Sequence, residues 1–122
     1  MKLCWVTITV KDMQESIDFY EKVVGLKVSK RYKPDENIEI SFLSSDLTDV
    51  KIELICNKKI PQPVHGNDIS LGFETLSLDD MIQKLKLHGI TKIDGPHSPN
   101  PAVRFIFIKD PNGVKIQFVE SH

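Results

Sequence analysis

A short stretch of alternating apolar and polar residues occurs twice in this chain, and this repeat constrains the fold more than any other feature. The sequence VKIELI at 50–55 recurs as VKIQFV at 114–119, and the same offset, 114 − 50 = 64 residues, carries Gly25 onto Gly89. Each copy has the period of a β-strand with one buried face. The chain therefore consists of two half-chains of one design. They differ at one informative position, where Gln117 stands in place of Glu53.

Size and charge exclude several classes of protein. A chain of 122 residues fits one compact domain. A net charge of −1 with 27% charged residues indicates neither nucleic acid nor membrane as a partner. No apolar run approaches the ~20 residues of a membrane span or resembles a signal peptide, so the expected location is cytoplasmic. Cys4 and Cys56 lie in strand-like runs, which favours buried, reduced thiols over a disulfide or a metal pair.

The first half reads as a βαβββ module over residues 1–56. Residues 3–10 alternate as a strand, with Trp5 facing away from the side that a helix would cover. Asp12 is placed to cap the following helix, and Gly25 is placed to end it. Three more strands are predicted, over 26–32, 38–43 and 50–56.

A linker over 57–68 contains two prolines and a glycine, and a second βαβββ module follows over 69–122. Ser77 is placed to cap its helix, and Gly89 to end it. The strands are expected at 69–75, 90–93, 103–108 and 114–120. The proline-rich segment 95–101 is expected to be a loop, and DPNG at 110–113 a tight hairpin turn.

Two motifs then point to a family. DMQESIDFYEKVVGL at 12–26 fits the pattern DxxxSxxFYxxxxGL, and the second half closes on FIKDPNGVKIQF at 107–118. Together with the paired modules, these motifs resemble the vicinal oxygen chelate superfamily, which includes glyoxalase I, bleomycin-resistance proteins, fosfomycin-modifying enzymes and extradiol dioxygenases. The resemblance covers essentially the whole chain. It implies an α+β fold of two tandem βαβββ modules, whose curled mixed sheets surround a cleft, and a homodimer.

The resemblance also locates the positions at which metal-dependent members hold a divalent ion. Carried over to this chain, they are Trp5, Glu53, Ser70 and Gln117. Only Glu53 is a normal ligand at its place, because an indole offers no lone pair, and a neutral hydroxyl or amide binds a divalent ion poorly. We therefore expect a degenerate metal site and no cofactor.

The same four positions suggest a ligand site. Trp5 supplies a flat apolar face for a planar or cationic ligand. Glu53 is either a proton-transfer group or the polar anchor of a binding pocket, and Ser70 or Gln117 can donate hydrogen bonds. Arg104 is a further candidate at the mouth of the cleft, as is His97.

Plainer interpretations stay open at this point. Trp5 can be ordinary core, and Glu53 an exposed strand residue paired with a lysine. Lys51 and Lys115, which share the parity of Glu53 and Gln117, form either a basic rim for an anionic ligand or a solvated surface.

The preferred prediction is a protein that binds a small organic molecule, aromatic or cationic, without a metal, in the manner of antibiotic-sequestering relatives. Its rival is a metal-dependent lyase of the glyoxalase I type (lactoylglutathione lyase), acting on thiol adducts of 2-oxoaldehydes. A third possibility is a metal-free isomerase that uses Glu53. A divalent metal is expected only under the rival.

Overall fold

The computed structural model describes residues 1–121, which fall into two compact units on either side of the bond between Val64 and His65. This division lies inside the predicted linker 57–68. Each unit contains one βαβββ module. The predicted end of the second module, residue 122, lies outside the described residues.

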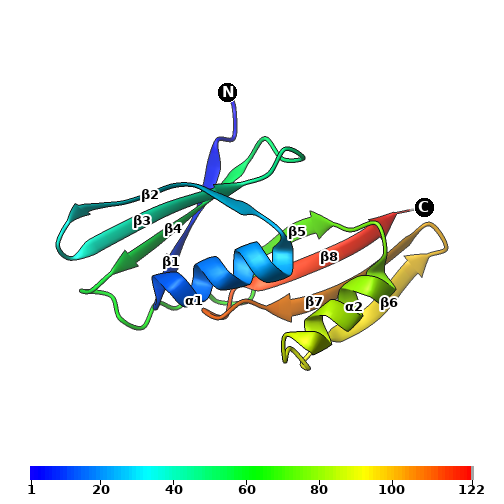
Figure 1. Cartoon of the computed structure of the whole chain (residues 1–122). Coiled ribbons are helices and arrows are strands. Elements are labelled where there is room, and N and C mark those ends of the chain that lie inside the picture. The colour runs from blue at the N-terminus through cyan, green and yellow to red at the C-terminus, as the bar shows by residue number, and fades with distance from the viewer. Residues whose placement is uncertain (122) are drawn as a thin grey trace. The chain divides into compact units, whose positions relative to one another are not determined.

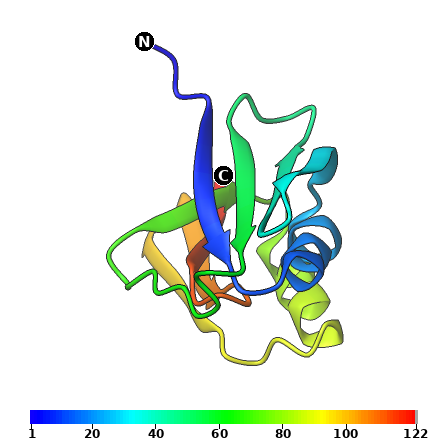
Figure 2. The ribbon, with the colours of Figure 1, turned by 90° about the vertical axis from the view of Figure 1, so that its left-hand side faces the viewer.

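The first unit is one sheet with a helical segment on one face (Figure 1). Its strands are β1 (Trp5–Val10), β2 (Lys27–Asp35), β3 (Ile38–Ser44) and β4 (Lys51–Asn57), and its helical segments are α1 (Met13–Asp18) and η1 (Phe19–Val24). The sheet order is β1-β4-β3-β2. β1 and β4 run parallel, side by side in Figure 2, whereas the other pairs are antiparallel. The sheet is therefore mixed, as predicted.

The helical segment begins and ends where the sequence predicts. The Asp12 carboxylate accepts a hydrogen bond from the Glu15 backbone N–H at 2.8 Å, and Gly25 ends the segment with a left-handed φ of +92°. Its second half is not α-helical, however. η1 is a π-helix, and the backbone N–H groups of Gly25 and Leu26 both donate to the carbonyl of Tyr20.

The core of the first unit lies between this helical segment and the sheet. The strand positions that alternate toward the helix are buried, and so are the helix positions that repeat at three and four residues. The buried apolar side chains include Ile8, Val10, Leu43, Ile52 and Leu54 from the sheet, and Met13, Ile17, Tyr20 and Val23 from the helix.

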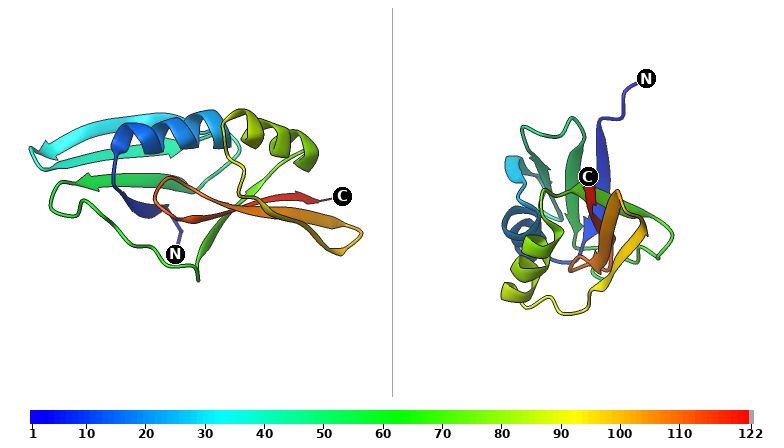
Figure 3. Two further views of the ribbon diagram at one scale, coloured as in Figure 1. Left: turned by 90° about the horizontal axis from the view of Figure 1, so that it is seen from below. Right: turned by 90° about the vertical axis from the view of Figure 1, so that its right-hand side faces the viewer.

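The second unit repeats the design with β5 (Ser70–Glu74), α2 (Leu78–Leu87), β6 (Asp94–Asn100), β7 (Val103–Lys109) and β8 (Lys115–Ser121). Its sheet order is β5-β8-β7-β6, with β5 and β8 parallel. α2 lies along one face of this sheet (Figure 3). The Ser77 hydroxyl accepts from the Asp80 N–H at 3.2 Å, which confirms the predicted cap.

One predicted strand of the second unit is wrong. Residues 90–93 are not a strand. The strand that follows α2 is instead β6, which is formed by the proline-rich segment that was expected to be a loop. Within the part of the chain that the structure describes, β6 is an edge strand that pairs with β7 alone, with register shifts on both sides of His97. Proline lacks an N–H donor, so it fits on an edge strand whose outer side has no partner and whose ladder is interrupted.

The predicted hairpin turn between β7 and β8 is confirmed. Asp110 is buried, and its Oδ1 accepts from the backbone N–H groups of Asn112 and Val114, each at 2.8 Å. The two modules thus give the predicted α+β fold with two mixed sheets. Among residues 1–121, no helix has both the length and the apolar character needed to cross a membrane.

Candidate functional site

The face of the first sheet that points away from the helical segment carries the candidate residues of this unit. The strand register sets Trp5 beside Lys51, and Glu53 between Thr7 on one side and Phe42 on the other. Residues paired in this way point to the same side of the sheet. The predicted orientation of Trp5, away from the helix, is therefore confirmed. We call this surface, formed by Trp5, Thr7, Phe42, Lys51 and Glu53, the Trp5 face.

Trp5 is not part of the buried core. The residue is 49% exposed, although Ile8 and Val10 on the opposite face of the same strand are buried. The Trp5 and Phe42 rings lie edge to face, with centroids 5.4 Å apart and an interplanar angle of 77°. This contact holds the indole in place while it leaves a flat apolar surface open.

Glu53 is buried, with only 8% of the residue exposed. The Thr7 hydroxyl donates to its Oε1 at 2.5 Å. Within residues 1–121, no lysine, arginine or histidine forms an ion pair with it, so the interpretation of Glu53 as an exposed strand residue paired with a lysine is wrong. A carboxylate held in this way can accept a further hydrogen bond or attract a cation.

The equivalent face of the second unit has different chemistry. Ser70 is exposed and lies beside Lys115, while Gln117 lies between Gly72 and Phe107. Gly72 thus takes the place that Thr7 has in the first unit, and a Cβ built on it would approach the Gln117 Oε1 to 3.6 Å. The structure therefore brings Ser70 and Gln117 to one face, without a hydroxyl donor directly beside the amide.

Arg104 lies on the other face of the second sheet. It pairs with Glu120, and its guanidinium forms ion pairs with Asp79 at 3.2 Å and with Glu120 at 3.6 Å. Glu120 also accepts from the backbone N–H of Leu78 at 3.1 Å. Arg104 is thus not brought together with Gln117, and its contacts hold the first turn of α2 against the sheet.

His97 does lie on the face of Gln117. It pairs with Phe105 across the sheet, and the two ring centroids are 5.4 Å apart. The His97 Nε2 lies 2.8 Å from the Asp94 carboxylate, which places this ring at the edge strand rather than beside Gln117.

Two residues of the Trp5 face were missed from sequence, Thr7 and Phe42. Thr7 could have been found, because it follows Trp5 by two positions in an alternating strand and therefore shares its face. Phe42 gave no such signal. Its position beside Glu53 depends on the pairing register of β3 with β4, which single-strand periodicity does not define.

The residues at the four family positions do not fit a divalent ion. Indole, hydroxyl and amide are poor donors beside one carboxylate. Among residues 1–121, no three His, Cys, Asp or Glu side chains gather closely enough to hold a metal ion.

The two cysteines are free, and they differ in environment. Cys4 precedes β1 and is exposed, so the prediction of a buried thiol is wrong there, because the strand begins one residue later. Cys56 is partly buried, and this burial raises the pKa of its thiol above the usual value.

Comparison with known proteins places the fold and the family. The model of the glyoxalase/bleomycin resistance protein/dioxygenase superfamily matches residues 2–118. Lactoylglutathione lyase of Escherichia coli O157:H7 is 30% identical over 129 residues, covering 99% of this chain and 93% of that enzyme. The antibiotic binding protein TnmS3 from Streptomyces sp. CB03234 superposes with a TM-score of 0.78 at 20% identity, covering 100% of this chain and 97% of that one. Glyoxalase I of Leishmania major gives 0.79 at 20% identity, covering 98% and 86%. Since the family model spans nearly the whole chain, the protein belongs to the glyoxalase/bleomycin resistance protein/dioxygenase superfamily.

Proposed function

We propose that this protein binds a small planar organic molecule, preferably a cationic one, on the Trp5 face without a metal ion. The observation that carries the proposal is a half-exposed indole next to a buried carboxylate that has no cationic partner in residues 1–121. TnmS3, which shares the fold, is described as an antibiotic binding protein. In the second unit, Ser70 and Gln117 are proposed as ligand-binding residues of their own sheet face, and a homodimer is the proposed assembly.

An aromatic cation satisfies both features of the Trp5 face. Its ring system can lie on the indole, and an aromatic pair is worth about 0.5–1.5 kcal/mol beyond the area that it buries. Its charge, set on an aromatic face, contributes about 0.5–2 kcal/mol, and the Glu53 carboxylate adds attraction that solvent screens weakly in a buried place. A neutral ring gains only the first of these terms.

Fluorescence tests the proposal directly, because Trp5 is the only tryptophan in the chain. We expect N-methylquinolinium to change the Trp5 emission in a saturable way, and neutral 1-naphthalenemethanol to bind about tenfold more weakly. Glu53→Gln should weaken quinolinium binding by about tenfold, whereas Glu21→Gln, which changes an exposed carboxylate of η1, should leave it unchanged. An emission change that never saturates, or equal binding by the Glu53→Gln variant, would contradict the proposal.

A second candidate is lactoylglutathione lyase activity, which the 30% identity over nearly the full length favours. Elemental analysis of protein purified without chelator separates the two candidates. Stoichiometric nickel, zinc, iron or manganese, together with turnover of the thiol adduct of a 2-oxoaldehyde, would overturn the metal-free proposal. We expect neither, because the donor set at the four family positions does not fit an ion.

The metal-free isomerase remains a proposal for Glu53 itself. In that case Glu53→Gln would abolish turnover and leave ligand affinity unchanged, because the amide cannot transfer a proton. If Glu53 only anchors the ligand, the same variant weakens binding instead.

A further inference from the structure

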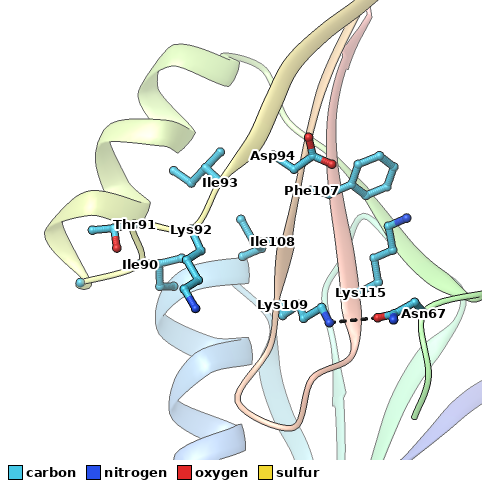
Figure 4. A pocket seen from close by; sticks show the side chains of 11 residues that line it. Asn67, Ile90, Thr91, Lys92, Ile93, Asp94, Phe107, Ile108, Lys109 and Lys115 are labelled. Atoms are coloured by element: carbon cyan, nitrogen blue, oxygen red, sulfur yellow. Dashed lines mark hydrogen bonds between the residues drawn. The ribbon is translucent and has the colours of Figure 1, made fainter.

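A hollow of about 700 Å³ lies in the second unit (Figure 4). It is formed by the segment between α2 and β6 together with β7, β8 and the end of the linker. We call it the lysine pocket, and its lining residues are Asn67, 89–94, 107–109 and Lys115. Its volume falls within the range of pockets that hold small organic molecules, about 300–1,000 Å³.

One part of the lysine pocket is apolar. Ile90 and Ile93 come from the segment after α2, and Phe107 comes from β7 (Figure 4). Ile108, the next residue of β7, points to the opposite face of the sheet and is buried. The segment after α2 was predicted to be a strand, and because it is instead an open connection, its isoleucines are available to line the pocket. These walls suit the hydrocarbon body of a ligand.

The remainder of the lysine pocket carries an excess of positive charge. Lys92, Lys109 and Lys115 line it, against a single carboxylate, that of Asp94. That carboxylate is already engaged by the His97 ring nitrogen at 2.8 Å. The pocket therefore favours an anion. Two of its three lysine ammonium groups make contacts that hold them in place.

Those two cations are Lys109 and Lys115. The Lys109 Nζ donates to the Asn67 Oδ1 at 2.9 Å, shown by the dashed line in Figure 4. The Lys115 Nζ lies 4.3 Å from the centroid of the Phe107 ring. An ammonium group has three donors, so the bond to Asn67 leaves Lys109 with two for a ligand. The contact with Phe107 brings positive charge to the apolar wall of the pocket.

We propose that the lysine pocket binds an amphiphilic organic anion, with a compact apolar body and one carboxylate or phosphate group. The body lies against Ile90, Ile93 and Phe107, and the anionic group accepts hydrogen bonds from Lys109 and Lys115. This proposal does not rest on the proposed function of the Trp5 face, since none of the lining residues belongs to the Trp5 face and the ligand has the opposite charge.

Calorimetric titration with three matched compounds tests the pocket. We expect 1-naphthoate and 1-naphthyl phosphate to bind, and neutral 1-naphthalenemethanol to bind at least about tenfold more weakly. The ratio between the two anions tells a carboxylate ligand from a phosphate ligand. Added salt should weaken both anions and leave the alcohol unchanged. Equal affinity for the alcohol, or no binding of either anion at millimolar concentration, would overturn the proposal.

Substitutions locate the binding. Lys109→Gln and Lys115→Gln should each weaken naphthoate by about three- to tenfold, whereas Lys86→Gln, an exposed lysine of α2 outside the pocket, should not. Trp5→Phe should leave naphthoate binding unchanged, which separates this site from the Trp5 face. In the unaltered protein, naphthoate should shift the backbone amide resonances of residues 90–93. Shifts confined to other segments, or an equal loss in Lys86→Gln, would contradict the assignment.

Discussion

The hydrogen bond between Thr7 and Glu53 gives the sharpest test of the Trp5 face. Thr7→Val keeps the shape of the side chain and its preference for a strand, but it removes the only hydroxyl described as donating to the buried carboxylate in residues 1–121. The Glu53 oxygen is then left without its donor. We expect the variant to lose stability even though its packing is conserved.

The magnitude follows from the partners involved. A hydrogen bond to a charged group contributes about 1.5–3 kcal/mol, and a buried charged acceptor left without a donor costs a similar amount or more. The added methyl group of valine returns a few tenths of a kcal/mol. We therefore expect Thr7→Val to lower the free energy of unfolding by about 2 kcal/mol, which is about 8 °C in Tm for a chain of this length.

A double-mutant cycle with Glu53→Leu separates this hydrogen bond from other effects of the substitution. In the Glu53→Leu background there is no acceptor, so Thr7→Val should cost less than about 0.5 kcal/mol, and the coupling energy should be about 2 kcal/mol. Urea unfolding followed by circular dichroism measures all four proteins. Thr91→Val, which changes an exposed threonine of the segment after α2, is the control and should cost less than about 0.5 kcal/mol.

An equal cost of Thr7→Val in both backgrounds would refute this reasoning. It would mean that the threonine acts through backbone or packing effects and that Glu53 does not depend on its hydroxyl. A stabilised Thr7→Val protein would refute it as well.

Three other predictions concern the helix cap, the thiols and Arg104. Asp12→Ala should lower the unfolding free energy by about 1 kcal/mol in urea titration, because it removes the acceptor at the start of α1. Cys4 should be alkylated before Cys56, as followed by mass spectrometry. Burial raises the pKa of Cys56, so its alkylation should still accelerate with pH above the usual thiol range, and the stability gained from keeping this thiol neutral is lost as the pH rises through its folded pKa. Arg104→Gln should reduce Tm, because Glu120 loses an ion pair, but should leave the affinity for N-methylquinolinium unchanged.

Much of the fold could be predicted because local patterns agree with tertiary packing. Strand alternation and helix caps depend on interactions within a few residues, so they can be recognised in the sequence. The structure contains the repeated modules, the alternating strands and the caps at Asp12 and Ser77. The strand predicted at 90–93 failed for a physical reason. Its apolar residues resemble a short strand, whereas the prolines of β6 conceal an edge strand that needs few N–H donors.

The candidate site was less predictable, since it depends on register. Parity alone places Trp5 and Glu53 on the face away from the helix, but only the alignment of β1 and β3 with β4 puts Thr7 and Phe42 beside that carboxylate. Arg104 was misplaced for a different reason, since parity alone would have located it. It lies on the same face of β7 as Ile106 and Ile108, which are buried, and therefore faces α2 rather than the side of Gln117.

The looser winding of η1 makes the chain tolerant of a change in length at this point. Six residues, Phe19–Val24, follow the wider π-helical path before Gly25. Removing one of them would let the remaining turn contract into ordinary α-helical hydrogen bonding, with the glycine still available to end it. α2 is an α-helix throughout Leu78–Leu87 and has no wider turn that could contract. Deleting one residue from it would therefore rotate every later helix side chain by about 100° relative to the sheet.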